Sequence, residues 1–194
     1  NHSKKLRIQN PIISNEDLDK IKFIKNVHFK SFTVSILYDI ILGLNGLEDA
    51  LGLIVKNIEN ELNKGVNIII LSDRGVSKKL APIPVLLATA HVHNAFKRLK
   101  KRSKFGIIIE SAEPREPHHF ALLFGYGASA INPFMVNEII INQTSKGAIS
   151  IKPEKAIINF NKAIATGIVK IMNKIGISTL HSYRGAQIFE ALGL

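Results

Sequence analysis

Two kinds of hydrophobic pattern alternate along the chain. Runs rich in β-branched residues occupy 31–38, 66–73 and 105–111; the first alternates in polarity, and the other two resemble strands buried on both faces of a parallel sheet. Apolar residues at helical spacing predict helices over six segments: 14–21, 47–65, 85–101 and about 118–124, 133–142 and 154–174. Strands that alternate with helices predict an α/β protein with a parallel sheet or a barrel-like arrangement.

Capping residues indicate where several of these elements begin and end. Ser14 precedes the first helix, whose first turn is acidic, and Gly65 ends the second helix. The last stretch, 176–194, predicts a short extended piece and a final helix. No internal repeat is present, so we expect a single domain over 1–194 in which 1–30 form a lead-in segment.

Composition excludes several classes of chemistry. The 194 residues contain no cysteine, which removes disulfides, a thiolate nucleophile, cysteine-bound zinc and a cysteine-held iron–sulfur cluster. No apolar run approaches the roughly 20 residues of a membrane span, and no signal peptide is apparent. We therefore expect a soluble, intracellular protein with no membrane partner. The first residue is not Met, which suggests a piece of a longer chain or a tag.

The net charge of +11 raises the question of a polyanionic partner. The basic excess is concentrated in 97–104, at the end of a predicted helix, where cations complement the helix dipole. Few aromatic residues lie near this run to stack on bases, and no nucleic-acid-binding fingerprint is present. We therefore expect a solvated helix end and no nucleic-acid partner.

Ionisable residues follow two of the predicted strands. Asp73 and Arg74 come after one strand and Glu110 ends another, and ligands of parallel α/β folds bind at the carboxyl ends of strands. The loop after Glu110 adds five more candidates: Glu113, Arg115, Glu116, His118 and His119. Two interpretations stay open. One is an acid–base site beside an anion-binding arginine.

The other interpretation is an ion-pair network that fixes the loop without catalysis. In it Glu110, with Glu113 or Glu116, pairs with the two arginines, Arg74 and Arg115. The turn at 72–75 leaves the same two alternatives open. Asp73 could act as an acid or base beside Arg74 as an anion-binding group, or it could cap local backbone amides.

Other classes of site find less support. His91 and His93 are two residues apart on a predicted helix, and the adjacent His118 and His119 also diverge, so neither pair favours a metal site. The segment 125–129 lacks the glycine spacing and the lysine of a phosphate-binding loop. No Gly-x-Ser-x-Gly elbow is present, which argues against serine hydrolysis.

Three blocks of sequence carry a resemblance to one family. They are "LSDRGV…APIPVLLATAHVH", "IIIESAEPREPHHFALLFGYGASAINPF" and "GIVKIMNKIGISTLHSYRGAQIFEALGL". Together with 6–18 and 46–75, these blocks resemble the central domain of the large, glutamine-dependent glutamate synthases, which lies between an amidotransferase domain and an FMN-binding barrel. The resemblance covers nearly the whole chain.

The resemblance implies a division of labour among domains. In that family an amidotransferase domain releases ammonia from glutamine, and the ammonia crosses a tunnel to 2-oxoglutarate at FMN, with electrons carried by an iron–sulfur cluster. The central domain is implied to be a connector that shapes the tunnel. Its fold would be α/β, with parallel strand–helix alternation in an incomplete TIM-barrel-like architecture.

For this chain, the resemblance implies partners rather than chemistry of its own. The flanking amidotransferase and FMN-binding domains of the same polypeptide would be the partners, and no catalytic, cofactor-binding or metal-binding residue is expected in the chain itself. The eight ionisable candidates then become structural or tunnel-loop residues. The alternative is a free-standing α/β enzyme for an anionic small molecule, with four working residues: Asp73, Glu110, Arg115 and His118.

Overall fold

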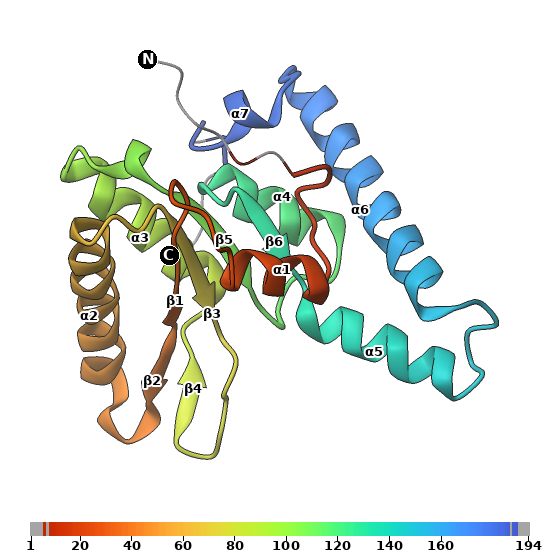
Figure 1. Cartoon of the computed structure of the whole chain (residues 1–194), viewed down its shortest axis with the longest axis horizontal. Helices are drawn as coiled ribbons and strands as arrows, with labels where there is room; N and C mark the ends of the chain where they lie inside the picture. Colours follow the sequence, from red (N-terminus) through yellow and green to blue (C-terminus); the bar gives the residue numbers. More distant parts are fainter. Residues whose placement is uncertain (1–5, 7, 187, 190–194) are drawn as a thin grey trace.

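A computed structural model describes residues 6, 8–186 and 188–189 of the chain. Its centre is a four-stranded parallel sheet in the order β1-β3-β5-β6 (Figure 1). The strands are β1 (Ser31–Ser35), β3 (Ile68–Ser72), β5 (Gly106–Glu110) and β6 (Ala130–Asn132). The connections carry the helices α2 (Gly43–Asn63), α3 (Val85–Arg98) and α4 (Pro117–Gly125). The predicted alternation of parallel strands and helices is confirmed, and the described strands do not close into a barrel.

Helices cover the outer face of the sheet and form the main core with it. Because the strands alternate, every second residue points to the helices. Helix α6 (Pro153–Ile175) packs on α4 on this side, and α5 (Phe134–Ser145) packs on α6. One continuous hydrophobic cluster joins strand residues to helix residues, among them Ile69, Leu71, Ile107, Ile109, Ile58, Phe96, Phe120 and Ile168.

The lead-in segment covers the inner face of the sheet. It contains α1 (Asn15–Lys22), which begins where Ser14 Oγ accepts a hydrogen bond from the backbone N–H of Asp17 at 3.1 Å. Leu18 and Ile21 of this helix are buried in a second hydrophobic cluster, with strand residues Ile68, Ile70, Ile108 and Ala130. The interior that a closed barrel would enclose is therefore occupied here by the chain's own helix.

The lead-in segment also extends the sheet at the β6 edge. Ile12 forms a parallel bridge with Ile131, and the N–H of Ile13 donates to the carbonyl oxygen of Ile131 at 2.9 Å. The N–H of Ile131 donates in turn to the carbonyl oxygen of Pro11 at 2.8 Å. These bonds pair backbone groups of β6 that would otherwise be left at an open edge.

The single strand predicted over 31–38 is wrong. The chain leaves the parallel sheet after β1 and changes partner: β2 (Leu37–Asp39) pairs antiparallel with β4 (Leu80–Pro82). The short turn η1 (Ile40–Leu42) then leads into α2, which begins at Gly43, four residues before the predicted start at 47. In Figure 1 this two-stranded ribbon extends below the sheet, beyond the carboxyl ends of its strands.

The C-terminal part of the chain is shorter in regular structure than the pattern suggested. The final described helix, α7, covers only Leu180–Tyr183, and part of the predicted last helix, at 187 and 190–194, lies outside the described residues. A short helical turn, η2 (Arg102–Lys104), follows α3. None of the helices in the described part of the chain is long and apolar enough to cross a membrane.

Candidate functional site

Four polar side chains line up across the carboxyl end of the parallel sheet. Ser35, Ser72, Glu110 and Asn132 are successive cross-strand partners in the backbone register. Because side chains alternate along a strand, all four point to the inner face, the one that α1 covers. The last three are buried. We call these four residues the polar row.

Glu110 is the most strongly held member of the polar row. Its side chain is 2% exposed, and its Oε1 accepts hydrogen bonds from Lys22 Nζ at 2.9 Å and from Arg74 Nε at 2.6 Å. Burial alone would raise the pKa of Glu110, but hydrogen bonds from Lys22, Ser72 and Arg74 outweigh burial and hold the pKa below its ordinary 4.5. Glu110 is therefore a stably ionised carboxylate and not a proton donor.

Arg74 links Glu110 to α5. Its Nη1 donates to Glu138 Oε1 at 3.1 Å, and its guanidinium lies 3.9 Å from the centre of the Phe134 ring. The expected Glu110–Arg74 pair is present, and two unexpected residues, Lys22 and Glu138, extend it into a chain of four charges. This network connects the lead-in segment, the end of β3, β5 and α5.

Asp73 binds the loop that follows the neighbouring strand β5. Its carboxylate is 2% exposed and accepts hydrogen bonds from Ser111 Oγ at 2.6 Å and from the N–H of Ala112 at 3.0 Å. Burial raises the pKa of Asp73 above its ordinary 3.8 despite these bonds, and the nearby Glu110 carboxylate adds to the increase. Asp73 thus holds the start of the loop after β5, 38 and 39 residues away in sequence, and not the local amides of its own turn that the turn interpretation predicted.

The loop after Glu110 is fixed by local bonds rather than by the expected ion pairs. Glu113 Oε1 accepts from the N–H of Val85 at 2.8 Å, which satisfies a free amide at the start of α3. His119 accepts from the N–H of Arg115 at Nδ1 (3.2 Å), and its Nε2 lies 3.2 Å from Glu116 Oε1. The expectation that Glu113 or Glu116 pairs with an arginine was therefore wrong.

Arg115 and His118 do not join the carboxylates. The Arg115 side chain is exposed and has no ion pair within the described ranges, while His118 packs edge-on against Phe189 with ring centres 5.9 Å apart. No hydrogen bond or ion pair connects either residue to Asp73 or Glu110 in the described structure. The four residues of the free-standing enzyme alternative are therefore not assembled into one site.

A cluster of amide side chains, which was not predicted from the sequence, lies beside the polar row. Asn132 Nδ2 donates to the carbonyl oxygen of Ile13 at 3.0 Å and to Asn15 Oδ1 at 2.9 Å, and Asn137 Nδ2 donates to the same Asn15 oxygen at 3.1 Å. Three buried oxygens, Glu110 Oε2 and the Oδ1 atoms of Asn132 and Asn137, have no hydrogen-bond partner within the described residues. No local pattern marks these positions, because the partners lie more than 100 residues apart.

The carboxyl edge does not fit a flavin or a metal ion. Helix α1 lies on the inner face at this edge, and Lys22 Nζ occupies the space next to Glu110, where a cofactor of a barrel enzyme would need room. Among the described residues, no group of three or more His, Cys, Asp or Glu side chains could hold a metal ion. The polar row therefore binds other parts of this chain.

One arginine of the basic run is half-buried at the opposite edge of the sheet. Arg102, predicted to be solvated with the rest of 97–104, instead points inward: its Nη1 and Nη2 donate to the carbonyl oxygens of Phe105 at 2.7 Å and Gly127 at 2.8 Å. Its Nε donates to His93 Nδ1 at 3.1 Å, and burial lowers the pKa of Arg102 to about 10. His93 is therefore engaged by a cation and is not a metal ligand in this arrangement.

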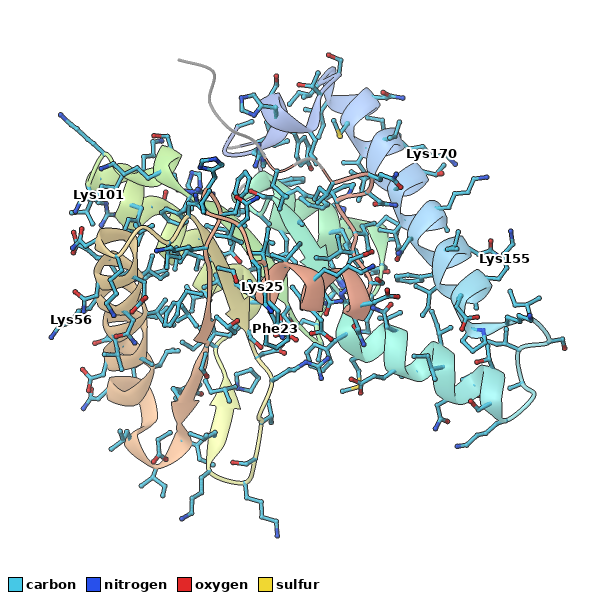
Figure 2. All side chains as sticks on the ribbon, in the orientation of Figure 1. Phe23, Lys25, Lys56, Lys101, Lys155 and Lys170 are labelled. Atoms are coloured by element: carbon cyan, nitrogen blue, oxygen red, sulfur yellow. The ribbon has the colours of Figure 1, made fainter. Side chains whose placement is uncertain are left out.

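The remaining positive charge is spread over the outside of the molecule. Figure 2 shows Lys56 on α2 and Lys155 and Lys170 on α6 directed away from the sheet. All three are exposed. Within the basic run, Lys97, Arg98, Lys100 and Lys104 are also exposed, as expected for a solvated helix end.

The two buried carboxylates are expected to give opposite pH dependences. The lowered pKa of Glu110 means that its contribution to stability is present above pH 4.5, its ordinary pKa, and is lost as the pH falls through its lower folded-state value. The raised pKa of Asp73 means that its contribution is present below pH 3.8, its ordinary pKa, and is lost as the pH rises through its higher folded-state value.

Urea unfolding between about pH 7 and about pH 3 tests this assignment. Glu110→Gln should make the loss of stability on acidification shallower than in the parent chain, and Asp73→Asn should make it steeper. Slopes that change in the same direction for both variants would contradict the two assignments.

Comparison with known proteins places this architecture in a family. The family model described as the glutamate synthase central domain matches residues 1–194. The chain belongs to this family. It is 40% identical to the large chain of the NADPH-dependent glutamate synthase of Bacillus subtilis over 191 residues. The matched region covers 98% of this chain and 12% of that relative.

Other glutamate synthases are similar over the same extent. The NADH-dependent glutamate synthase of Schizosaccharomyces pombe is 36% identical over 98% of this chain, which spans 9% of that relative. Ferredoxin-dependent glutamate synthase 2 of Synechocystis is 35% identical over 99% of this chain, which spans 13% of that relative. The chain therefore spans about a tenth of the length of these relatives.

Solved structures bear out the predicted barrel-like fold of this glutamate synthase central domain. A mutant flavocytochrome b2 with pyruvate bound matches with a TM-score of 0.54 and 13% identity, over 92% of this chain and 54% of that chain. A second mutant, with benzoylformate, gives a TM-score of 0.55 and 11% identity over 68% of this chain. The family member described here has an incomplete, TIM-barrel-like version of that architecture.

Proposed function

We propose that the chain is the central module of a longer glutamate synthase polypeptide, which converts glutamine and 2-oxoglutarate to glutamate. In this role it links the amidotransferase and FMN-binding domains and forms part of the wall of the tunnel that carries ammonia between them. It has no catalytic step of its own. The observation that carries the proposal is the family match over residues 1–194, combined with a chain that spans about a tenth of its relatives.

The contacts at the carboxyl edge support a connector rather than an enzyme. Glu110 is neutralised by Lys22 and Arg74, and Asp73 is used by Ser111 and Ala112, so neither carboxylate is available to a substrate. FMN and the iron–sulfur cluster of the parent polypeptide would belong to other domains, because this chain has no cysteine and α1 covers the inner face of its sheet.

A fluorescence titration of free FMN with the purified chain tests the absence of a flavin site. We expect no quenching at tens of micromolar chain, because α1 and Lys22 occupy the inner face where a flavin would lie. Lys22→Ala serves as the second variant, since it removes the α1 side chain that contacts Glu110. Saturable, stoichiometric quenching by the parent chain would contradict the connector proposal.

The exposed loop after Glu110 is the candidate tunnel or docking segment. Because the Arg115 side chain is exposed and makes no ion pair within the described structure, Arg115→Ala should leave the melting temperature of the chain unchanged. In the full polypeptide the same substitution should uncouple glutamine hydrolysis from glutamate formation, measured as ammonia released per glutamate formed. An unchanged ratio would remove Arg115 from the proposed tunnel wall.

A further inference from the structure

An apolar surface lies at the end of the β2–β4 ribbon. Its side chains come from the turn after β2, from the start of α2 and from β4. Their exposed fractions are 46% for Ile40, 76% for Ile41, 58% for Leu42, 70% for Leu44 and 37% for Leu80. Leu80 is the cross-strand partner of Asp39, so it lies next to the turn that carries the other four. We call these five residues the apolar tip, and Figure 1 shows the segment at the lower end of the molecule.

The apolar tip is held rigidly rather than carried on a loose loop. Asp39 Oδ1 accepts from the N–H of Ile41 at 3.0 Å, and the N–H of Ile40 donates to the carbonyl oxygen of Lys79 at 3.0 Å. Gly43 follows with a φ of +55°, a conformation that favours glycine. The chain therefore fixes the backbone that presents these apolar side chains to solvent.

Close packing under the tip strengthens this conclusion. A Cβ at Gly46 would lie 2.7 Å from Leu42 Cβ and 2.9 Å from the carbonyl oxygen of Asp39, so only glycine allows the turn to sit on the first turn of α2. Clustered, exposed apolar residues are uncommon on a soluble surface and mark contact sites. A rigid backbone lowers the entropy that is lost when such a contact forms.

Charges of both signs border the apolar tip. Lys78 and Lys79 are exposed on the β4 side, and Glu48 and Asp49 are exposed on the α2 side. Glu48 is four residues after Leu44 and shares its helix face. A surface that covers the tip would therefore place carboxylates opposite the lysines and cations opposite the acids, which fixes its orientation.

The size of the tip argues for a tethered occupant. A stable complex of separate chains needs roughly 800 Å² on each partner, from 20–30 residues, and five side chains are far short of that. A domain in the same polypeptide docks through a smaller area, because the linker raises its effective concentration to the millimolar range. The relatives supply such domains, since this chain spans only 9–13% of their length.

We propose that the apolar tip, Ile40–Leu42 with Leu44 and Leu80, docks into an apolar surface of another domain of the same polypeptide, bordered by carboxylates that face Lys78 and Lys79. The inference rests on the proposed function, because it requires a longer polypeptide. It adds the place on this module where one neighbouring domain binds and the chemistry of the surface that binds it.

Photo-crosslinking in the full-length polypeptide tests the proposal. A benzophenone amino acid is introduced at position 41, and a control carries it at position 27, because Val27 is 86% exposed and lies at the opposite end of β1. A mixture of ¹⁵N-labelled and unlabelled polypeptide separates crosslinks within one chain from those between copies. We expect position 41, and not 27, to crosslink within one chain to a peptide outside residues 1–194.

Two results would overturn the proposal. One is crosslinking of position 41 to a second copy, which would make the tip a self-association surface; the other is a yield at position 41 no higher than at position 27. Glutamate formation by the same polypeptide is assayed separately. A polypeptide that crosslinks as expected but forms no glutamate would refute the proposed function and leave the docking site standing.

Discussion

Glu110→Ala should lower the free energy of unfolding of the chain by about 3 kcal/mol, because it leaves Lys22 and Arg74 next to each other without the carboxylate that both contact. This value is at the lower end for a broken buried ion pair, since the Lys22 and Arg74 side chains are 22% and 41% exposed and water recovers part of the loss. Urea unfolding followed by circular dichroism measures the change.

Glu138→Ala is the matched control for this substitution. Glu138 contacts the same arginine at 3.1 Å, but its side chain is 48% exposed, so its removal should cost less than about 1 kcal/mol. Equal losses of unfolding free energy for the two variants would contradict the central role of Glu110 in the network. They would mean that burial of this carboxylate does not strengthen its ion pairs.

Gly167→Ala should lower stability by about 2 kcal/mol, because a Cβ at this position of α6 would overlap the ring that begins α4. The added carbon would lie 2.6 Å from both Cβ and Cγ of Pro117, and the proline ring is too stiff to move aside. The substitution therefore pushes α6 away from α4, the helix that follows the candidate tunnel loop.

Gly52→Ala offers the same chemical change with the opposite expected sign. Gly52 lies within α2, is exposed, and has nothing within 4 Å of a built Cβ, so alanine should stabilise the chain by roughly 0.5–1 kcal/mol through helix propensity alone. Both variants are measured by urea unfolding of the same preparation. A gain of stability at both positions would contradict the close contact between α4 and α6.

The central strands were predictable from the sequence because both of their faces are buried. The runs over 66–73 and 105–111 contain β3 and β5, where nearly every side chain is buried and the polar residues, Ser72 and Glu110, stand only at the last position of each strand. The failure at 31–38 has a different cause. The residues on both sides of Ile36 are extended, as their local strand propensity favours. The change of partner from β3 to β4 depends on tertiary pairing, which the local sequence does not encode.

The candidate site was predictable only in part, for a similar reason. Asp73, Arg74 and Glu110 end adjacent parallel strands or follow them directly, so their proximity follows from the fold class. Lys22 reads as an ordinary basic residue in the last turn of a helix, and its contact with Glu110 spans 88 residues of sequence. Arg115 shows the converse: it lies in a densely charged part of the sequence, yet its side chain is exposed and makes no ion pair within the described residues.

The position of the lead-in segment has a consequence for synthesis of the protein. Residues 12–22 leave the ribosome before the strands they contact, and their partners in β5 and β6 are made about 90 to 120 residues later, given that the Lys22–Glu110 contact spans 88 residues and the Ile13–Asn132 contact spans 119. At about 5–20 residues per second, this delay is on the order of 10 s. During that time α1 has only β1 and β3 to cover, so its contacts with β5 and β6 form last, and the lead-in segment is fully packed only after β6 has been made.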